Sequence, residues 1–142
     1  MRVMVLIKAD ERAEAGELPD QKYLEAMLNY NEELVKAGVL LAGEGLAPTS
    51  RGKRVRFKDG RTTVIDGPFT ETKELLAGYW LWQVRSMEEA VEWVKRIPVP
   101  EGYEQEEGVV EIREVFEPEE FGDTMTPEMQ EKDRQWRSAG NQ

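Results

Sequence analysis

Two segments of the chain are apolar at odd and even positions alike. Val3 to Lys8 and Gly78 to Val84 each carry apolar side chains on both sides of an extended strand. Because successive side chains of a strand point to opposite faces, a strand of this kind is covered on both faces. Val39 to Leu46 and Gly108 to Val115 are predicted as two further strands.

Apolar residues recur at helical spacing in two other segments. The first segment follows Pro19 and Asp20, which suit the start of a helix, and stops at Gly38. Glycine is common just past the end of a helix, and an acid in the first turn is favoured by the helix dipole. The second segment opens on Ser86 and Glu89, which have the spacing of a capping box. Both segments are predicted as amphipathic helices.

The dipeptide Asp59-Gly60 lies between two alternating segments, 53–58 and 61–66. This is the strongest short-range signal for a β-hairpin. A helical turn through Leu75 and Leu76 is expected after the hairpin. The predicted order is therefore strand, helix, strand, inserted hairpin, strand, helix, strand. This order indicates an α+β fold with ferredoxin-like, βαβ-hairpin-βαβ topology.

Two helices cover only one face of a sheet, yet the first and third main strands are apolar on both faces. Exposed apolar surface on that scale is rare on monomers. In a small chain, the second face is most simply buried by another copy of the same chain. We therefore predict a homodimer in which two sheets pack face to face.

The chain is predicted to consist of a domain over residues 1–116 and an acidic C-terminal extension over residues 117–142. In the extension, Thr126 and Pro127 suit the start of a short helix. Met129 and Trp136 are its main apolar residues. Two interpretations stay open, a frayed terminus and a helix whose Trp136 docks on the body or on a partner subunit.

The 142 residues include no cysteine and no histidine. Disulfide scaffolds, thiolate nucleophiles, Cys/His zinc sites and Ser-His-Asp triads are thereby excluded. Acid–base chemistry near neutral pH would rely on carboxylates, lysine or tyrosine. A metal site would consist of oxygen ligands alone, and no acidic loop resembles an EF-hand. We expect neither a metal nor a cofactor.

The formal net charge of −10 argues against nucleic acid as a direct partner. Six cations gather between Arg51 and Arg61, but a charged run is more often a solvated face than a binding patch. No run approaches the roughly 20 apolar residues that span a bilayer. The N-terminal segment lacks the features of a signal peptide. We therefore expect a cytoplasmic protein that does not contact membranes.

The run Asp66-Gly67-Pro68-Phe69 places a carboxylate beside the two strongest backbone breakers. One interpretation is structural, with the Asp66 side chain accepting backbone N–H groups of the following turn. The other interpretation is a direct role for Asp66 as a ligand-binding or catalytic acid. Phe69 is expected to fill the core or a dimer interface.

Other polar residues are expected near the same cleft as Asp66. Glu111 and Arg113 interrupt an apolar strand face, and Glu44 shares its face with Leu40. A charge on a buried face requires a partner, which Arg113 or Lys73 would supply. The group is either a structural ion-pair network or a pocket in which a desolvated carboxylate abstracts a proton. The candidate set comprises Asp66 as the catalytic residue and Glu44, Lys73, Glu111 and Arg113 as binding residues, with Lys8 nearby.

The chain resembles the YCII-related proteins, and within them the subgroup with the DGPF signature. The resemblance runs from Arg2 to about Val115. It rests on the opening strand, the signature itself and several flanking motifs: Gly43-Glu44-Gly45-Leu46-Ala47-Pro48, Gly78-Tyr79 and Val110-Glu111-Ile112-Arg113. The resemblance implies a dimeric α+β barrel of ferredoxin-like subunits.

The resemblance also implies two kinds of function. YCII-like proteins are described with a His–Asp pair in a cleft, and a few are similar to small-molecule lyases or dehydrochlorinases. This chain has no histidine to form that pair. DGPF proteins are also similar to modules that accompany extracytoplasmic-function sigma factors.

Two hypotheses about function follow. In the first, a homodimer binds a small molecule in a cleft near Asp66, with an unknown activity. In the second, the protein is a non-enzymatic accessory or regulatory module associated with transcription, and acts through protein–protein contact.

Overall fold

The computed structural model describes residues 1–140. The chain forms one main sheet, one separate hairpin and several helices. The strands are β1 Arg2–Lys8, β2 Leu40–Gly45, β3 Lys53–Lys58, β4 Arg61–Asp66, β5 Leu76–Gln83 and β6 Val110–Glu114. The helices are α1 Glu11–Glu14, α2 Gln21–Lys36, α3 Met87–Lys95 and α4 Pro127–Gly140, with short 3₁₀ turns η1 Thr49–Arg51, η2 Thr72–Glu74 and η3 Pro118–Thr124.

The main sheet has the strand order β2-β5-β1-β6, and its neighbouring strands are antiparallel. With β3 and β4 set aside as an insertion, this is the ferredoxin-like order expected from the sequence. The α+β class and this topology are confirmed. Ser86 caps α3 as expected, because its side chain accepts the backbone N–H of Glu89 at 3.1 Å. Pro19 and Asp20 were expected in the first turn of α2, but the helix begins at Gln21, and Asp20 is its N-cap, which accepts the backbone N–H of Tyr23 at 2.8 Å.

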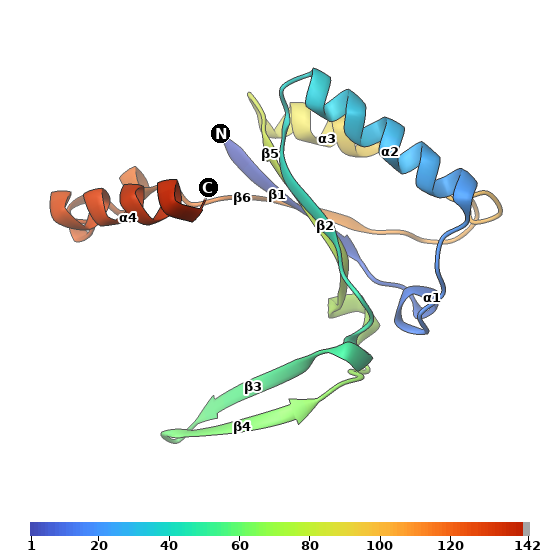
Figure 1. Ribbon diagram of the computed structural model, residues 1–142, viewed down its shortest axis with the longest axis horizontal. Helices are drawn as coiled ribbons and strands as arrows, with labels where there is room; N and C mark the ends of the chain where they lie inside the picture. The colour runs from blue at the N-terminus through green and yellow to red at the C-terminus, as the bar shows by residue number, and fades with distance from the viewer. Residues whose placement is uncertain (141–142) are drawn as a thin grey trace.

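The core lies between one face of the sheet and the helices α2 and α3, which both cover that face (Figure 1). Val3 and Val5 of β1 and Trp82 of β5 are fully buried there. Tyr30 of α2 donates its hydroxyl to the carbonyl of Trp93 in α3 at 2.6 Å, which ties the two helices together. Burial of these side chains is the main stabilising contribution to the fold.

Among residues 1–140, no helix lies over the opposite face of the sheet, which we call the open face (Figure 1). Its side chains are Met4 and Leu6 of β1 and those that the strand register aligns with them: Leu81, Tyr79, Arg113 and Glu111. Met4, Leu6, Tyr79 and Leu81 are only partly buried. The open face therefore carries an apolar centre without a cover.

The predicted grouping of Glu44 with Leu40 is wrong. The register shifts between Leu40 and Ala42, so that Leu40 pairs with Trp82 on the core face and Glu44 pairs with Tyr79 on the open face. A bulge adds one residue to a strand and reverses the faces beyond it.

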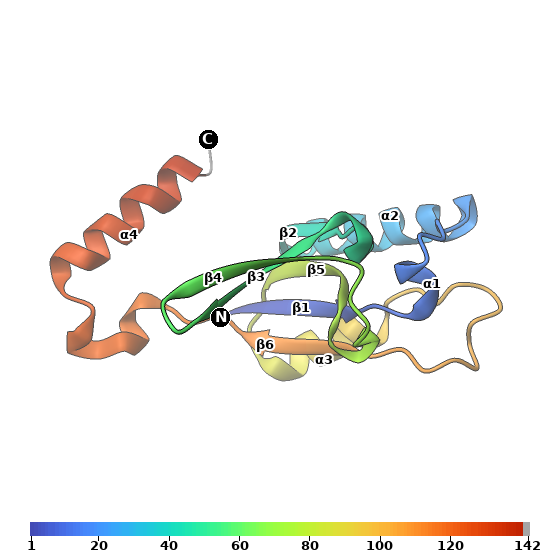
Figure 2. The same cartoon turned by 90° about the horizontal axis from the view of Figure 1, so that it is seen from below.

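Two segments project from the body of the protein. The hairpin of β3 and β4 leaves below the sheet, and α4 extends to one side (Figures 1 and 2). The first segment has the predicted bounds, 53–58 and 61–66. The helix predicted after Thr126 is α4. The last two residues of the predicted 117–142 extension lie outside the described residues. Within residues 1–140, no helix combines the length and apolarity that a membrane crossing needs.

One expected turn is displaced. The helical turn predicted through Leu75 and Leu76 is the 3₁₀ turn η2, which ends at Glu74. Leu75 is instead extended and buried, and Leu76 begins β5. The two leucines belong to the sheet because their backbone continues the antiparallel ladder.

Candidate functional site

The Asp66-Gly67-Pro68-Phe69 corner is held against the 3₁₀ turn η1. The Gly67 N–H donates to the carbonyl of Gly52 at 3.1 Å, and the Phe69 N–H donates to Thr49 Oγ1 at 3.0 Å. A Cβ atom on Gly67 would lie 1.7 Å from the Thr49 carbonyl oxygen. The corner therefore requires glycine because the two backbones touch, and not because of an unusual φ.

Thr49 links this corner to a third part of the chain. Its hydroxyl donates to Glu14 Oε2 at 2.5 Å, and its backbone N–H donates to Glu14 Oε1 at 3.1 Å. Both carboxylate oxygens of Glu14 thus accept hydrogen bonds from Thr49. Hydrogen bonds to a charged acceptor are stronger than neutral ones. The Glu14 carboxylate fixes η1, and η1 in turn fixes the position of Phe69.

Arg54 of β3 covers the ring of Phe69. Its guanidinium carbon lies 3.9 Å from the ring centroid, and one of its nitrogens lies 3.6 Å from a carboxylate oxygen of Glu71. Stacking of arginine on an aromatic face holds the guanidinium plane in one orientation. Of the two places expected for Phe69, the core is wrong, because its half-buried ring lines a surface hollow, and a place in a dimer interface stays a prediction.

Asp66 lies at the end of β4, outside the lining of that hollow. Its carboxylate accepts a hydrogen bond from Lys53 Nζ, directly across the hairpin, at 2.5 Å. The Asp66 side chain is 76% exposed, so the desolvation that a proton-abstracting carboxylate requires is missing from it. Among residues 1–140, its hydrogen-bond partner is this lysine, and not a backbone N–H of the following turn.

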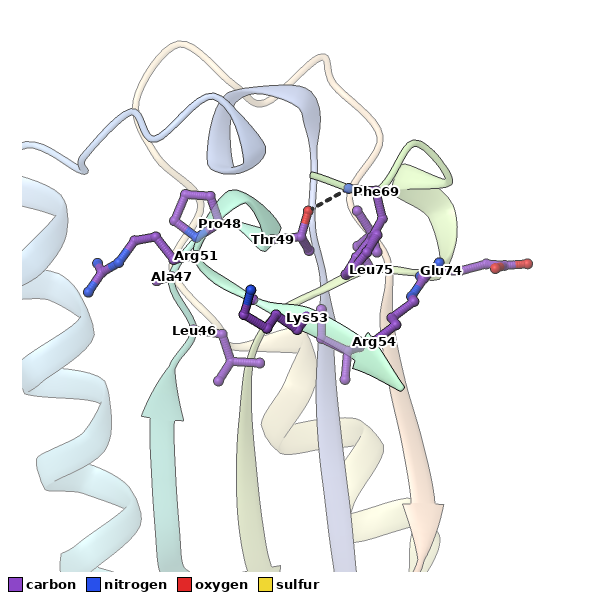
Figure 3. A pocket seen from close by; sticks show the side chains of 12 residues that line it. Leu46, Ala47, Pro48, Thr49, Arg51, Lys53, Arg54, Phe69, Glu74 and Leu75 are labelled. Carbon is purple, nitrogen blue, oxygen red and sulfur yellow. Dashed lines mark hydrogen bonds between the residues drawn. The ribbon is translucent and has the colours of Figure 1, made fainter. Parts of the chain in front are cut away.

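The hollow beside the corner has a volume of about 450 Å³ and is open to solvent. Its walls are apolar, from Leu46, Pro48, Phe69 and Leu75, and its charged lining residues are Arg51, Lys53, Arg54 and Glu74. Figure 3 shows Arg51 and Glu74 extending away from the group in opposite directions, whereas Lys53 lies near its middle. The hollow thus combines an apolar surface with two nearby cations.

The structure divides the predicted site residues into two groups. Glu44, Glu111 and Arg113 are on the open face, where Glu111 forms an ion pair with Lys8 at 3.7 Å. These residues do not line the hollow beside Asp66. Lys73 lies in η2, next to the lining residue Glu74 but outside the lining. None of the predicted site residues therefore lines the hollow, and three of them share the open face.

The described residues contain no cluster of three or more acidic side chains with the geometry of a metal site. Two cations that line the hollow are each paired with an acid outside its lining, Lys53 with Asp66 and Arg54 with Glu71.

Comparison with known proteins identifies the family. The model of the YCII-related domain matches residues 1–119. This chain belongs to the YCII-related family. The match covers all six strands and the hollow beside the corner, and it ends within η3, so that α4 lies outside it.

One curated protein is similar to this YCII-related protein over part of its length. An uncharacterised protein of Rhizobium meliloti (strain 1021) is 34% identical over 76 residues. These residues are 54% of this chain and 61% of that protein, so the chain spans less than two thirds of its curated relative.

A solved structure is also similar, namely 5-chloro-2-hydroxyhydroquinone dehydrochlorinase from Burkholderia phenoliruptrix AC1100 in complex with 2,5-dihydroxybenzoquinone. The two chains are 17% identical with a TM-score of 0.40, over 82% of this chain and 96% of that one. A likeness at this level says nothing about activity.

Glu14, Thr49 and Arg54 escape prediction from the sequence. Glu14 and Thr49 are 35 positions apart and meet only in the folded chain. For Arg54 a signal exists, because the Asp59-Gly60 turn fixes the hairpin register and thereby places Arg54 at the base of β3, beside Lys53.

Proposed function

We propose that this protein is a homodimeric member of the DGPF subgroup that binds a small organic acid in the hollow beside Asp66. The observation that carries the proposal is the pairing of Lys53 and Arg54 with the apolar walls of the hollow. Binding sites for small molecules combine apolar walls with a few placed polar groups. A ligand with a carboxylate and a flat apolar body matches both elements.

In this proposal, Arg54 is the main residue that binds the ligand carboxylate. Its stacking on Phe69 holds the guanidinium plane, which can donate two parallel hydrogen bonds to a carboxylate. The existing contact to Glu71 is long, at 3.6 Å, so donors of Arg54 are available to a ligand. The ring of Phe69 and the side chain of Leu75 supply the surface for the apolar part of the ligand.

Lys53 adds a second cation, and Asp66 acts on the hollow through it. The side chains of the Lys53–Asp66 pair are 65% and 76% exposed. Exposed ion pairs contribute little free energy, so a ligand carboxylate can replace Asp66 at the ammonium group. In this proposal Asp66 is a positioning residue that keeps Lys53 at the hollow in the unliganded protein.

The homodimer is supported by the open face. Met4, Leu6, Tyr79 and Leu81 form an apolar strip there, flanked by Glu111 and Arg113. A second open face of the same kind would bury this strip and place charged side chains of both copies near one another. Sedimentation velocity at micromolar concentration tests this part, and a monomer would contradict it.

The ligand proposal is tested by titrating the protein with benzoate, naphthoate and their neutral amides, with binding followed by protein-detected NMR. The acids are expected to bind and the amides are not. Arg54→Ala is expected to weaken binding roughly tenfold to a hundredfold, the effect of losing charged hydrogen bonds. Arg56→Ala is the matched control, because Arg56 is on the same face of β3 but outside the hollow.

Asp66→Asn separates the possible roles of the acid. If Asp66 competes with the ligand for Lys53, the substitution strengthens binding of the acids or leaves it unchanged. A loss of binding would contradict this competition, because it would mean that the bound ligand still needs the Asp66 carboxylate. If no acid binds and both arginine variants behave alike, the hollow is not a ligand site, and the accessory-module hypothesis gains support.

A further inference from the structure

The hairpin over residues 53–66, which we call the basic hairpin, has two different faces. Directly opposite residues of antiparallel strands share a face. Val55 pairs with Val64 and Phe57 with Thr62, which makes one face apolar beyond the Lys53–Asp66 pair at its base. The other face carries the cations Arg54, Arg56, Lys58 and Arg61.

The apolar face of the basic hairpin is exposed to solvent. The exposed fractions are 78% for Phe57, 60% for Val64 and 50% for Val55. The basic hairpin projects from the body (Figure 1). An isolated two-stranded hairpin is marginally stable in water. This segment therefore needs a covering surface, which the described part of its own chain does not provide.

The segment over residues 117–140, which we call the acidic arm, has complementary properties. It carries seven carboxylates and three cations: Glu117, Glu119, Glu120, Asp123, Glu128, Glu131 and Asp133 against Lys132, Arg134 and Arg137. Its helix α4 exposes Met129 and Trp136, which are seven residues apart and share a helix face. The Trp136 side chain is 60% exposed.

Unpaired charges of opposite sign remain on the two segments. Within residues 1–140, the structure shows no ion pair for three cations of the basic hairpin or for four carboxylates of the acidic arm, one of which, Glu120, accepts the backbone N–H of Glu117. These are Arg56, Lys58 and Arg61 on one side and Glu119, Glu120, Asp123 and Glu128 on the other. Complementary charge of this kind fixes the register and partner of an interface.

The two segments leave opposite ends of the sheet. The basic hairpin follows Gly45, which pairs with Gly78 and so lies level with Ile7 near the end of β1. The acidic arm follows Glu114, which pairs with Val3 near the start of β1. The seven residues of β1 separate these ends by roughly 20 Å.

We propose that the acidic arm of one copy binds the basic hairpin of a second copy, reciprocally in a two-fold dimer. If two open faces stack with their strands running in opposite directions, the hairpin end of one sheet meets the arm end of the other. Phe57 and Val64 then lie near Met129 and Trp136, with the unpaired charges around them. This inference rests on the proposed homodimer and adds its contacts.

The test uses thiol cross-linking between two variants of the full chain. Because the sequence has no cysteine, each introduced thiol is unique. Thr62→Cys lies beside Phe57 in the hairpin, and Lys132→Cys lies on the helix face of Met129 and Trp136. Isotope-labelled Thr62→Cys protein is mixed with unlabelled Lys132→Cys protein, treated with a short bis-maleimide, and the products are identified by mass spectrometry.

Cross-linked pairs that contain one labelled and one unlabelled chain are expected as the main product. The matched control replaces Lys132→Cys by Lys36→Cys, an exposed lysine of α2 on the helix-covered side of the sheet. A yield no higher than that of the control would overturn the inference. Sedimentation of the same samples distinguishes the homodimer proposal from the arm–hairpin proposal. A dimer that does not form this cross-link would contradict only the contact between the acidic arm and the basic hairpin.

A charge exchange provides a second measurement. Arg56→Glu with Lys58→Glu in the hairpin, or Glu119→Lys with Glu128→Lys in the arm, is expected to weaken self-association on the order of tenfold. Mixing the two reversed variants is expected to restore association as a mixed dimer. At one interface of that dimer, the reversed hairpin meets the reversed arm, so that opposite charges face each other again. The other interface joins the unchanged hairpin and the unchanged arm and keeps the native pairing. Self-association unchanged by either reversal would contradict the proposal.

Discussion

The substitution Gly67→Ala tests how the signature corner is held. The added Cβ would lie 1.7 Å from the carbonyl oxygen and 2.6 Å from the carbonyl carbon of Thr49. Ordinary van der Waals contact begins at 3.4 Å. The clash is with backbone and not with a flexible side chain, so one of the two segments must move by roughly 1.5 Å.

That movement breaks specific hydrogen bonds. The Phe69 N–H loses Thr49 Oγ1, and the Gly67 N–H loses the carbonyl of Gly52. Overpacking together with these losses is expected to cost about 2–3 kcal/mol of unfolding free energy. For a domain of this size, roughly 3–4 °C of melting temperature corresponds to each kcal/mol, so a decrease of about 6–12 °C is expected.

The assay combines thermal unfolding with amide hydrogen exchange at Phe69. Gly45→Ala is the matched control, because a Cβ on that glycine meets no atom within 4 Å. The control is expected to be close to neutral. A melting temperature within about 2 °C of the wild type, together with unchanged protection of the Phe69 amide, would refute the reasoning about the corner.

Three further predictions concern individual hydrogen bonds. Thr49→Val, which removes the hydroxyl bonded to Glu14, is expected to cost about 2 kcal/mol in urea unfolding, and Thr49→Ser is expected to restore most of it. Burial raises the pKa of Tyr30, so its contribution to stability is complete below about pH 10 and is lost as the pH rises further. Tyr30→Phe is expected to reduce this alkaline loss and to cost about 1 kcal/mol at neutral pH, and an unchanged alkaline profile would contradict the assignment. The hydrogen bond from Arg2 lowers the pKa of Glu117, whose contribution is present above the ordinary glutamate pKa and is lost as the pH falls through the lowered value. Glu117→Gln is expected to cost less than about 1 kcal/mol, since the pair is partly exposed, but to speed proteolysis of the acidic arm, and unchanged proteolysis would show that this pair does not hold the arm.

The fold was largely predictable because its signals are local. Asp59 and Gly60 both have positive φ, at 52° and 72°, as a two-residue hairpin turn requires. The apolar pattern of β1 and β5 also located the central strands. The face of Glu44 was not predictable, because the bulge between Leu40 and Ala42 depends on pairing with β5.

The site was predictable only in part. The sequence pointed to the corner that contains Asp66, but the partner of Asp66 follows from strand register and the anchor at Thr49 from a distant contact with Glu14. Glu111 and Arg113 were expected in the same cleft, and the structure places them on the open face instead. Long-range contacts of this kind leave no periodic trace in a sequence.

The position of the hairpin within the chain has a consequence for how the family can vary. Gly45 and Gly78 are paired neighbours in the sheet, so the segment between them begins and ends at almost the same point. Closing a longer loop there adds little entropic cost, because that cost grows only with the logarithm of loop length. The four-stranded sheet can therefore fold around insertions of different lengths, and the segment is a natural place for relatives to diverge or for a foreign peptide to be displayed.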